Sequence, residues 1–363
     1  MKEKKEVLLL GSYSGNNLGD LGILKSIVKN MPRNFFFYIP TKYPKKLANY
    51  IEKKNVYFFK GITSYIGFKS FKYLNRSDII VIGGGGLFFD RKIFNPFYNH
   101  IINLFFIVLI NNLLYKKKVY LFSVGASHLN SKISLFLTKY ILNSSNIITV
   151  RDNLTREIFS KLTNKKISVF YDPAFLLKPK MNMEIDNLIN KMGEKKILIS
   201  VNSFILYKKK KFLIDLINTL DKKYSIFLYE NSSFQNNALN FYNLNKKYLN
   251  SNNIYLLGEN IYYSPEEIIY LLSKFNFIIS APMHSSIFAY NVNQKLYVYE
   301  YDFKVREFNN IIKNKNILNS SGLIDNYNIL DNYYEIDYQK NKESILYNVS
   351  RGFKKIEEYI YRI

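Results

Sequence analysis

Residues 77–90 read Ser-Asp-Ile-Ile-Val-Ile-Gly-Gly-Gly-Gly-Leu-Phe-Phe-Asp. The apolar run from Ile79 to Ile82 is typical of a buried strand, and four consecutive glycines, Gly83 to Gly86, follow it directly. Glycine loses the most conformational freedom on folding, but it leaves the backbone N–H groups bare and accepts positive φ angles. An ordinary connection between a strand and a helix is short and seldom needs more than two glycines, so a mobile connection is the less favoured alternative. The stretch therefore predicts a strand end at which an anion or a substrate approaches the main chain closely.

A second glycine-bearing segment lies at the amino end of the chain. The apolar run 5–10 is followed by Gly-Ser-Tyr-Ser-Gly-Asn-Asn-Leu-Gly-Asp-Leu-Gly over residues 11–22, and then by a helical pattern. The first three of these glycines are spaced by four, which matches neither the dinucleotide fingerprint nor the nucleoside-triphosphate loop. Asn17 and Asp20 lie where the helix should begin. Asp20 is therefore either the N-cap of this helix or a carboxylate that binds substrate.

Apolar runs alternate with helical patterns along the whole chain. Strands are predicted at 35–39, 56–59, 79–82, 119–123, 147–150 and 167–171, and again at 196–201, 224–229, 254–257, 275–280 and 295–300. Continuous apolar strands separated by helices are typical of a parallel sheet covered on both faces. A polar stretch around 178–194 interrupts the pattern. We therefore expect an α/β fold of two Rossmann-like doubly wound parallel-sheet domains facing a cleft, over 1–178 and 179–345, followed by a C-terminal helix over 346–363.

Polar side chains gather at the predicted strand ends, where open α/β sheets bind their ligands. Arg151 and Asp152 follow the strand at 147–150, and Asp172 precedes a proline, which forces an extended backbone there. An arginine at the end of a buried strand is costly unless its charge is compensated. Arg151 should therefore either pair with a neighbouring carboxylate or bind an anion.

His284 is the candidate for acid–base chemistry. A lone histidine is more often structural, but His284 falls in the first turn of a helix that starts at a strand end, beside Ser285 and other serines. Histidine titrates near neutrality and can both donate and accept a proton there. The three histidines, at 100, 128 and 284, lack metal-ligand spacing, and the chain has no cysteine. We therefore expect no metal site and no disulfide scaffold.

The formal net charge of +24 does not indicate nucleic-acid binding, because the lysines are spread along the chain instead of clustering on one arm. A basic surface favours acidic substrates and anionic lipid headgroups. The lysine runs 116–118 and 208–211 are interpreted as solvated ends of elements, with membrane-surface contact as the alternative. The apolar run 101–110 is too short to span a bilayer. We expect it to form a buried helix, with a membrane-facing helix as the less favoured alternative.

Seven segments together resemble the polysaccharide pyruvyl transferase family. They are Gly-Ser-Tyr-Ser-Gly-Asn-Asn-Leu-Gly-Asp (11–20), Ile-Gly-Gly-Gly-Gly-Leu-Phe (82–88), Val-Gly-Ala (124–126), Arg-Asp-Asn-Leu-Thr (151–155), Asp-Pro-Ala-Phe (172–175), Met-His-Ser-Ser-Ile-Phe-Ala (283–289) and Tyr-Asp-Phe-Lys-Val-Arg-Glu-Phe (301–308). They occur in family order and cover roughly residues 1–310. Each segment is weakly diagnostic alone, but the set is specific.

The resemblance implies a GT-B-like architecture and a defined reaction. The family transfers the enolpyruvyl group of phosphoenolpyruvate to two hydroxyls of a sugar, which yields a cyclic pyruvate ketal and free phosphate. The acceptor would belong to a cell-envelope polysaccharide, such as a capsule or an exopolysaccharide, or to its lipid-linked precursor. Phosphoenolpyruvate would be a co-substrate, with no bound cofactor and no nucleic-acid partner. The charged amino terminus is not typical of a signal peptide, so we expect a cytoplasmic enzyme, with peripheral contact at the inner face of the cytoplasmic membrane as an additional expectation.

The resemblance also implies site residues. His284 would be the acid–base residue, and Arg151 with the adjoining loops would hold phosphoenolpyruvate. The further substrate-binding candidates are Asn17, Asp20, Gly84, Gly85, Gly86, Ser285, Lys304 and Arg306.

One position departs from the family pattern. Family members usually carry Arg-Leu-His where this chain has Pro282-Met283-His284. Proline has no charge and donates no hydrogen bond, so an anion clamp is missing here. Lys304 or Arg306 replaces the clamp, or the donor differs, or activity is lost. Two rivals therefore stay open, a GT-B-like glycosyltransferase that uses a nucleotide sugar and a non-catalytic relative in glycan assembly.

Overall fold

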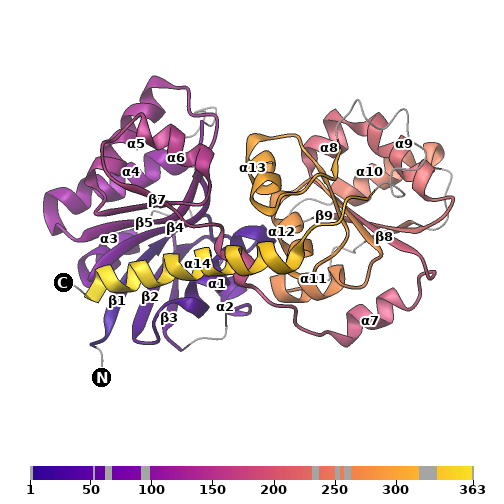
Figure 1. Cartoon of the computed structure of the whole chain (residues 1–363). Helices are drawn as coiled ribbons and strands as arrows, with labels where there is room; N and C mark the ends of the chain where they lie inside the picture. The colour runs from indigo at the N-terminus through magenta and orange to yellow at the C-terminus, as the bar shows by residue number, and fades with distance from the viewer. Residues whose placement is uncertain are drawn as a thin grey trace. The chain divides into compact units, whose positions relative to one another are not determined.

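The sheets of the chain belong to two compact units, which Figure 1 shows as a ribbon. The computed structural model describes residues 3–51, 54–61, 68–90, 99–230, 237–249, 254–256, 263–318 and 333–361. The first unit comprises Met1–Gly15, Asp20–Pro173 and Ile345–Ile363, and the second comprises Asn16–Gly19 and Ala174–Ser344. The main boundary thus follows Pro173, whereas the sequence analysis placed it after residue 178.

The first unit is built on a seven-stranded parallel sheet of order β3-β2-β1-β4-β5-β6-β7. Its strands are β1 (Lys5–Leu10), β2 (Phe35–Thr41), β3 (Val56–Lys60), β4 (Ile79–Phe88), β5 (Lys118–Ala126), β6 (Ile147–Val150) and β7 (Ile167–Val169). Most residues of β1, β4, β5 and β6 are buried, because helices cover both faces of the sheet.

Two sets of helices cover this sheet (Figure 1). They are α1 (Leu18–Asn30), α2 (Pro44–Ala48), α3 (Phe68–Arg76), α4 (His100–Ile110) with a π-helical turn (Asn111–Tyr115), α5 (Lys132–Ser144), α6 (Asn153–Ser160) and α14 (Tyr338–Tyr361). Helices α3 to α6 share one apolar core with alternate strand residues. On the other face, Phe353 of α14 packs edge-on against Phe122 of β5, with ring centroids 4.8 Å apart.

The second unit has a six-stranded parallel sheet of order β10-β9-β8-β11-β12-β13. Its strands are β8 (Lys196–Val201), β9 (Ser225–Glu230), β10 (Ile254–Leu256), β11 (Phe277–Ser280), β12 (Leu296–Tyr299) and β13 (Ile317–Leu318). Its helices are α7 (Met183–Ile189), α8 (Ser203–Lys208), α9 (Lys210–Leu220), α10 (Asn237–Asn245), α11 (Pro265–Leu272), α12 (Met283–Asn291) and α13 (Phe303–Ile312). Helices α8, α9 and α10 pack with the strands in one apolar core.

The predicted α/β class, with two doubly wound parallel sheets, is confirmed, and each predicted strand is present. Four details differ from the expectation. β4 continues through the glycines to Phe88, β13 was not predicted, and the polar stretch at 178–194 contains α7. The C-terminal helix begins at Tyr338, eight residues before the expected start.

The strand orders define one topological switch point in each sheet. In the first unit the chain runs from β1 outward to β2 and β3, and then returns to place β4 on the other side of β1. In the second unit β8 and β11 are related in the same way. The crevice outside the carboxyl ends of such a strand pair is where open α/β sheets bind ligands. The residues after β1, β4, β8 and β11 therefore lie where a ligand is expected to bind.

Candidate functional site

The four glycines lie inside β4. The sequence analysis had instead expected the strand to end at Ile82 and the glycines to follow it. Gly84 and Gly85 have φ angles of +64° and +84°, and the pairing of β4 with β5 shifts register after Gly86. A Cβ on Gly84 would overlap Cγ2 of Ile23 in α1. Glycine is therefore required here both by the left-handed backbone and by the close approach of α1.

Only one of the four glycines is exposed. Gly83, Gly84 and Gly85 are buried, whereas Gly86 reaches the surface. Gly86 pairs in register with Gly125 of β5, so two bare backbones lie side by side. Gly84 and Gly85 therefore pack inside the unit, and Gly86 has exposed surface that a ligand could reach; the substrate-binding role of all three stays a prediction.

Arg151 lies over this bare backbone. A Cβ on Gly125 would sit 2.5 Å from Arg151 Nε and 2.8 Å from its Cζ, and a Cβ on Gly86 would meet Nη2 at 3.6 Å. The guanidinium thus occupies the space that the missing side chain leaves at Gly125. The role of Gly125 was not predicted, because no local signal in the sequence says which side chain will cover a glycine.

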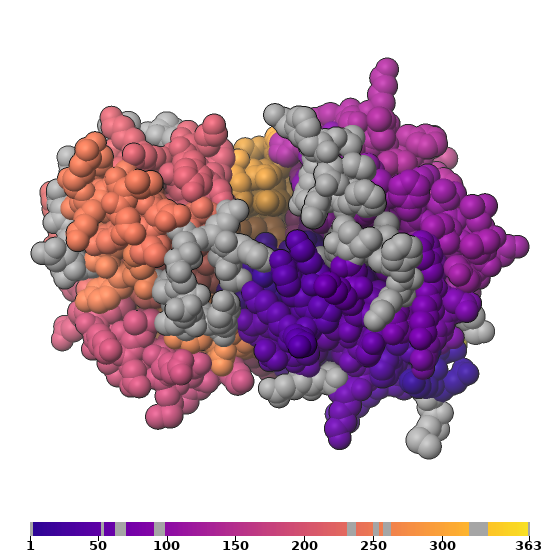
Figure 2. Space-filling view, turned by 180° about the vertical axis from the view of Figure 1, so that it is seen from behind, coloured from indigo at the N-terminus to yellow at the C-terminus, as the bar shows by residue number. Residues whose placement is uncertain are grey.

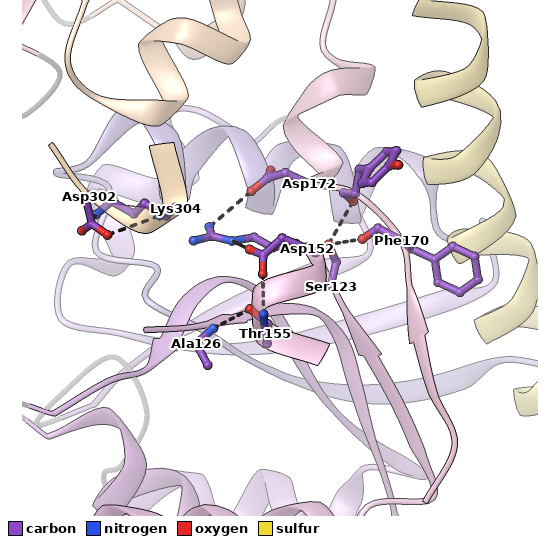
Figure 3. Close-up of polar contacts among 10 residues, drawn as sticks. Ser123, Ala126, Asp152, Thr155, Phe170, Asp172, Asp302 and Lys304 are labelled. Atoms are coloured by element: carbon purple, nitrogen blue, oxygen red, sulfur yellow. Dashed lines mark hydrogen bonds and ion pairs between the residues drawn. The ribbon is translucent and has the colours of Figure 1, made fainter. Parts of the chain in front are cut away.

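The Arg151 guanidinium is compensated by two buried carboxylates (Figure 3). Its Nε lies 3.3 Å from Asp152 Oδ2, and its Nη1 lies 3.6 Å from Asp172 Oδ2. All three residues are at most 6% exposed. Of the two alternatives for Arg151, pairing with a neighbouring carboxylate is therefore the one observed, and anion binding by Arg151 stays a prediction.

Hydrogen bonds among three strand ends hold this cluster in place (Figure 3). Asp152 is the N-cap of α6 and accepts from the N–H of Thr155 at 2.7 Å, while Thr155 Oγ1 accepts from the N–H of Ala126 at 2.9 Å. Ser123, at a φ of +51°, donates to the carbonyl oxygens of Phe170 and Tyr171 at 2.9 and 3.0 Å. The backbone just before Asp172 is thereby tied to β5. The contacts of Ser123 and Thr155 were not predicted, since serine and threonine at these positions carry no distinctive spacing.

Tyr13 connects the two glycine segments of the first unit. Its side chain is buried, and its hydroxyl donates to the carbonyl oxygen of Gly83. Burial, together with the negative charges of Asp20 and Asp172, raises the pKa of Tyr13 well above its usual range. The hydroxyl therefore stays protonated and remains a donor at neutral pH.

Asp20 lies inside the first turn of α1 and is not its N-cap. The cap is Asn17, whose Oδ1 accepts from the N–H of Gly19 at 2.8 Å, and α1 begins at Leu18. Asp20 Oδ1 lies 3.4 Å from the position of a Cβ on Gly85. The capping interpretation of Asp20 is therefore wrong, and its substrate-binding role stays a prediction.

Asp90 follows β4 and organises the start of α5. Its Oδ2 accepts from the N–H groups of Asn130 and Ser131 at 2.6 and 2.8 Å. Burial opposes ionisation of Asp90, but hydrogen bonds from Ser134, Asn130 and Ser131 outweigh it and lower its pKa. The carboxylate is thus ionised and structural at neutral pH.

In the second unit, His284 lies in the first turn of α12, immediately after the switch-point strand β11. Pro282 is the N-cap of this helix. A Cβ on Gly19 would sit 2.7 Å from His284 Cβ and closer still to the ring atoms Nδ1 and Cγ. The imidazole therefore packs on the bare backbone of Gly19, which clusters with this unit. Two motifs 265 residues apart in sequence meet here. His284 as a whole is partly buried, and its ring nitrogen Nε2 has almost no exposed surface.

The serines around His284 hold the helix to the sheet. Ser285 is fully buried, and Ser200 of β8 donates to its Oγ at 2.9 Å. Ser280 and Ser286 both donate to the carbonyl oxygen of Pro282, at 3.1 and 3.2 Å. Ser285 thus packs α12 on β8, and its substrate-binding role stays a prediction.

Lys304 and Arg306 follow the neighbouring strand β12, and both are ion-paired. Lys304 Nζ lies 3.6 Å from Asp302 Oδ2, a contact drawn in Figure 3, and Arg306 Nε lies 2.6 Å from Glu300 Oε1. The side chains of Lys304 and Arg306 are 37% and 58% exposed. Each cation is thus partly neutralised by its neighbour, but each remains open to solvent, and their role as a substitute clamp stays a prediction.

An aromatic pair lies at the carboxyl ends of β8 and β12. Phe204 stacks on Tyr301, with ring centroids 5.2 Å apart and planes inclined by 23°. Burial and the charge of Asp302 raise the pKa of Tyr301 to about 12. This pair and Lys304 belong to strand ends on either side of β11.

Among the described residues, no group of three or more His, Asp or Glu side chains is placed so that it could hold a metal ion. In the same part of the chain, no helix is both long and apolar enough to cross a membrane.

Solved structures share this architecture at low sequence identity. UDP-GlcNAc 2-epimerase from Methanocaldococcus jannaschii superposes with a TM-score of 0.62 at 14% identity, covering 99% of both chains. A putative UDP-N-acetylglucosamine 2-epimerase from Listeria monocytogenes gives 0.63 at 10% identity, covering 98% of this chain and 96% of the other. An α,α-trehalose-phosphate synthase (UDP-forming) from Burkholderia vietnamiensis gives 0.58 at 9% identity, covering 100% and 99%. At such identities the likeness shows the fold alone, which is GT-B-like.

Sequence comparison identifies the family. No curated protein matches the chain. The family model described as polysaccharide pyruvyl transferase matches residues 17–303, which include the glycine strand, the Arg151 cluster and the His284 helix. The chain belongs to the polysaccharide pyruvyl transferase family.

Proposed function

We propose that this protein transfers the enolpyruvyl group of phosphoenolpyruvate to two hydroxyls of a sugar, forming a pyruvate ketal and inorganic phosphate. The family membership supports a transferase of this class. The observation that carries the proposal is the position of His284. It follows the switch-point strand of its sheet, and its side chain packs against the backbone of Gly19. A glycine that makes room for the imidazole ring fixes the position of the ring, and an acid–base group must be held in position to act on substrate.

His284 is assigned the proton transfers. Addition begins when an acid protonates the methylene carbon of phosphoenolpyruvate, and the cationic carbon C2 is then captured by a sugar hydroxyl, which loses its proton. The bond from C2 to the phosphate oxygen breaks next, and the second hydroxyl attacks C2 and loses its proton. One proton is thus consumed at carbon, two are released by the hydroxyls, and one leaves with phosphate. A histidine can supply and collect protons in such steps.

The anionic donor needs fixed positive potential. The Arg151 cluster carries one positive and two negative side chains, so it has no net positive charge of its own. The N–H groups at the start of α12 and the helix dipole favour an anion beside His284. We therefore assign the phosphate or carboxylate of the donor to this helix start, with Lys304, Arg306, Arg151 and Gly86 as further contacts.

The acceptor is proposed to be a sugar of a cell-envelope polysaccharide or of its lipid-linked precursor. Asn17 and Asp20 carry amide and carboxylate oxygens suited to sugar hydroxyls. Phosphoenolpyruvate enters as a co-substrate, and we place the reaction in the cytoplasm, at the inner face of the cytoplasmic membrane when the acceptor is lipid-linked.

The test is the release of inorganic phosphate from phosphoenolpyruvate in the presence of candidate lipid-linked glycans. His284→Ala should lower the turnover by about 10²–10⁴-fold, the usual worth of a general acid–base group. The control is His128→Asn, because His128 has a φ of +47°, which asparagine tolerates. Wild-type turnover in His284→Ala at saturating donor would refute the assignment.

Pro282 gives the non-catalytic alternative a specific basis. The arginine usual at this position is missing, and the two cations offered as substitutes are paired with Asp302 and Glu300. A chain that binds no phosphoenolpyruvate until Pro282→Arg is introduced would establish this alternative. Release of a nucleoside diphosphate from a nucleotide sugar, without phosphate release from phosphoenolpyruvate, would instead establish the glycosyltransferase.

A further inference from the structure

Large apolar side chains are exposed on two neighbouring helices of the first unit. On α4 and its π-helical extension, Phe106, Leu113 and Leu114 are 48%, 67% and 70% exposed. On α5, Ile133 and Phe136 are 57% and 66% exposed. Single exposed apolar residues need no explanation, but a contiguous set indicates an interaction surface.

The exposed residues of α4 form one stripe. Ile102, Phe106 and Leu109 recur at i, i+4 and i+7, which places them on one face of α4. Leu113 and Leu114 follow on the π-helical turn. Ile102 and Leu109 are half-buried, so the stripe is apolar along its length. The 11 residues of α4 extend the stripe over about 16 Å.

Helix α5 lies beside α4 and also exposes apolar side chains. The rings of Phe105 and Tyr140 meet edge-on at 5.1 Å, and Asn112 Nδ2 donates to Tyr140 Oη at 3.1 Å, so the two helices lie side by side. Ile133, Phe136 and Tyr140 recur at i, i+3 and i+7 on α5. We call the set Phe106, Leu113, Leu114, Ile133 and Phe136 the α4–α5 patch.

Exposed lysines accompany the patch, and the stretch of sequence that forms it carries no acidic residue. Lys132 and Lys139 are exposed on α5, and Lys116 follows Leu114 by two residues. The sequence has no Asp or Glu between Asp90 and Asp152, although it contains 28 acidic residues in 363. At that average frequency, a stretch of this length would carry four or five. The atoms of this stretch, purple to magenta in Figure 2, lie at the surface of the first unit in that view.

We propose that the α4–α5 patch docks the protein on the surface of an anionic lipid bilayer. Apolar side chains flanked by lysines match the interfacial region, where rings and aliphatic chains enter the acyl boundary and lysines meet anionic headgroups. The patch spreads over the exposed sides of two helices, and a fluid bilayer can cover such a surface without a shape-matched partner. The proposal is independent of pyruvyl transfer, because vesicle binding requires neither donor nor acceptor.

The absence of tryptophan from the sequence permits a direct test. Leu113→Trp introduces a single fluorophore in the patch, and Leu244→Trp introduces one at an equally exposed site, 74% exposed, on α10. With vesicles of phosphatidylcholine and phosphatidylglycerol, the emission of Leu113→Trp should shift to shorter wavelength and be quenched by brominated acyl chains. The emission of Leu244→Trp should not change. Equal responses from both variants, or no response from Leu113→Trp, would overturn the proposal.

Co-sedimentation with the same vesicles separates the apolar and charge contributions. Replacing Phe106, Leu113 and Leu114 by glutamine should abolish binding, whereas glutamine at Met181, Met183 and Leu244, which are 72–77% exposed, should not.

Replacing Lys116, Lys132 and Lys139 by glutamine should lower the apparent affinity by about 100-fold, since each lysine near an anionic surface contributes roughly fivefold. Glutamine at Lys208, Lys210 and Lys211 removes the same charge from the second unit and should have little effect. Equal losses from both lysine sets would refute docking through this patch.

Sedimentation velocity distinguishes the protein alternative. If the wild type self-associates through the patch, the glutamine triple variant at 106, 113 and 114 becomes monomeric while neither form binds vesicles. That result would replace the bilayer by a second copy of the chain.

Discussion

Replacing Gly19 by alanine would place a methyl group against the side chain of His284. The new Cβ would lie 2.7 Å from His284 Cβ and closer to the ring, whereas two carbons in contact prefer about 3.5–4.0 Å. The imidazole must therefore move by roughly 1 Å. A displacement of that size can cost about 10²-fold in rate when the displaced group acts on substrate.

The effect on stability can be estimated in the same way. Gly19 lies in α1 with a φ outside the left-handed region, so alanine suits the backbone and would by itself gain about 1 kcal/mol. Overpacking costs about 1–3 kcal/mol, and a net loss of up to about 2 kcal/mol is expected. In a His284→Ala background the ring atoms are gone and only the Cβ of residue 284 remains near the new methyl group. The stability lost on replacing Gly19 by alanine should therefore fall by more than half.

The assay is phosphate release from phosphoenolpyruvate, with the urea unfolding midpoint measured on the same samples. The control is Lys29→Ala, an exposed position on the same helix. Two results would refute the reasoning: wild-type turnover in Gly19→Ala, or an unchanged stability cost of Gly19→Ala in the His284→Ala background. Either would show that the position of the imidazole does not depend on Gly19.

Three further predictions concern the strand ends. Gly125→Ala should destabilise the protein by about 1–3 kcal/mol, because its Cβ would sit 2.5 Å from the buried Arg151 Nε; an unchanged urea midpoint would contradict this. The pKa of Asp90 is lowered in the folded state, so the ionised carboxylate stabilises the protein above the ordinary pKa of 3.8, and this stabilisation is lost as the pH falls through the folded-state pKa. The difference in unfolding free energy between wild type and Asp90→Asn should therefore shrink from pH 7 to pH 3. A difference that stays constant would rule this out. Replacing Lys304 and Arg306 together by glutamine should raise the Michaelis constant for phosphoenolpyruvate, and an unchanged constant in an active enzyme would place the clamp elsewhere.

Local sequence patterns were sufficient for the sheets. Strands such as β1 and β8 are unbroken apolar runs, and their periodicity and flanking turns mark them without tertiary information. Two elements, β13 and α7, could not be predicted from the sequence, for physical reasons. β13 has only two residues, and α7 lies in a polar stretch whose helix start depends on the cap at Asn182.

Site chemistry was predicted only where the residue type alone decides it. The sequence posed the alternatives for Arg151, but the choice depended on Asp172, which lies on another strand end 21 residues later. Likewise, the packing of His284 on Gly19 joins segments 265 residues apart. Four glycines in a row mark a constrained backbone, but which neighbour constrains it is known only after α1 is docked on β4.

The helix α14 has a consequence for synthesis on the ribosome. Its residues from Ile345 onward belong to the first unit, where Phe353 packs on Phe122 and Lys355 donates to Ser168 Oγ at 2.6 Å. The N-terminal sheet therefore emerges long before the helix that completes it. At 5–20 residues per second, the 188 residues from Ala174 to Tyr361 take about 10–40 s to make. During that interval the part of the nascent sheet that α14 covers is left open, and a chain ending at Ser344 should be cleaved by proteases in the first unit at least as fast as in the second.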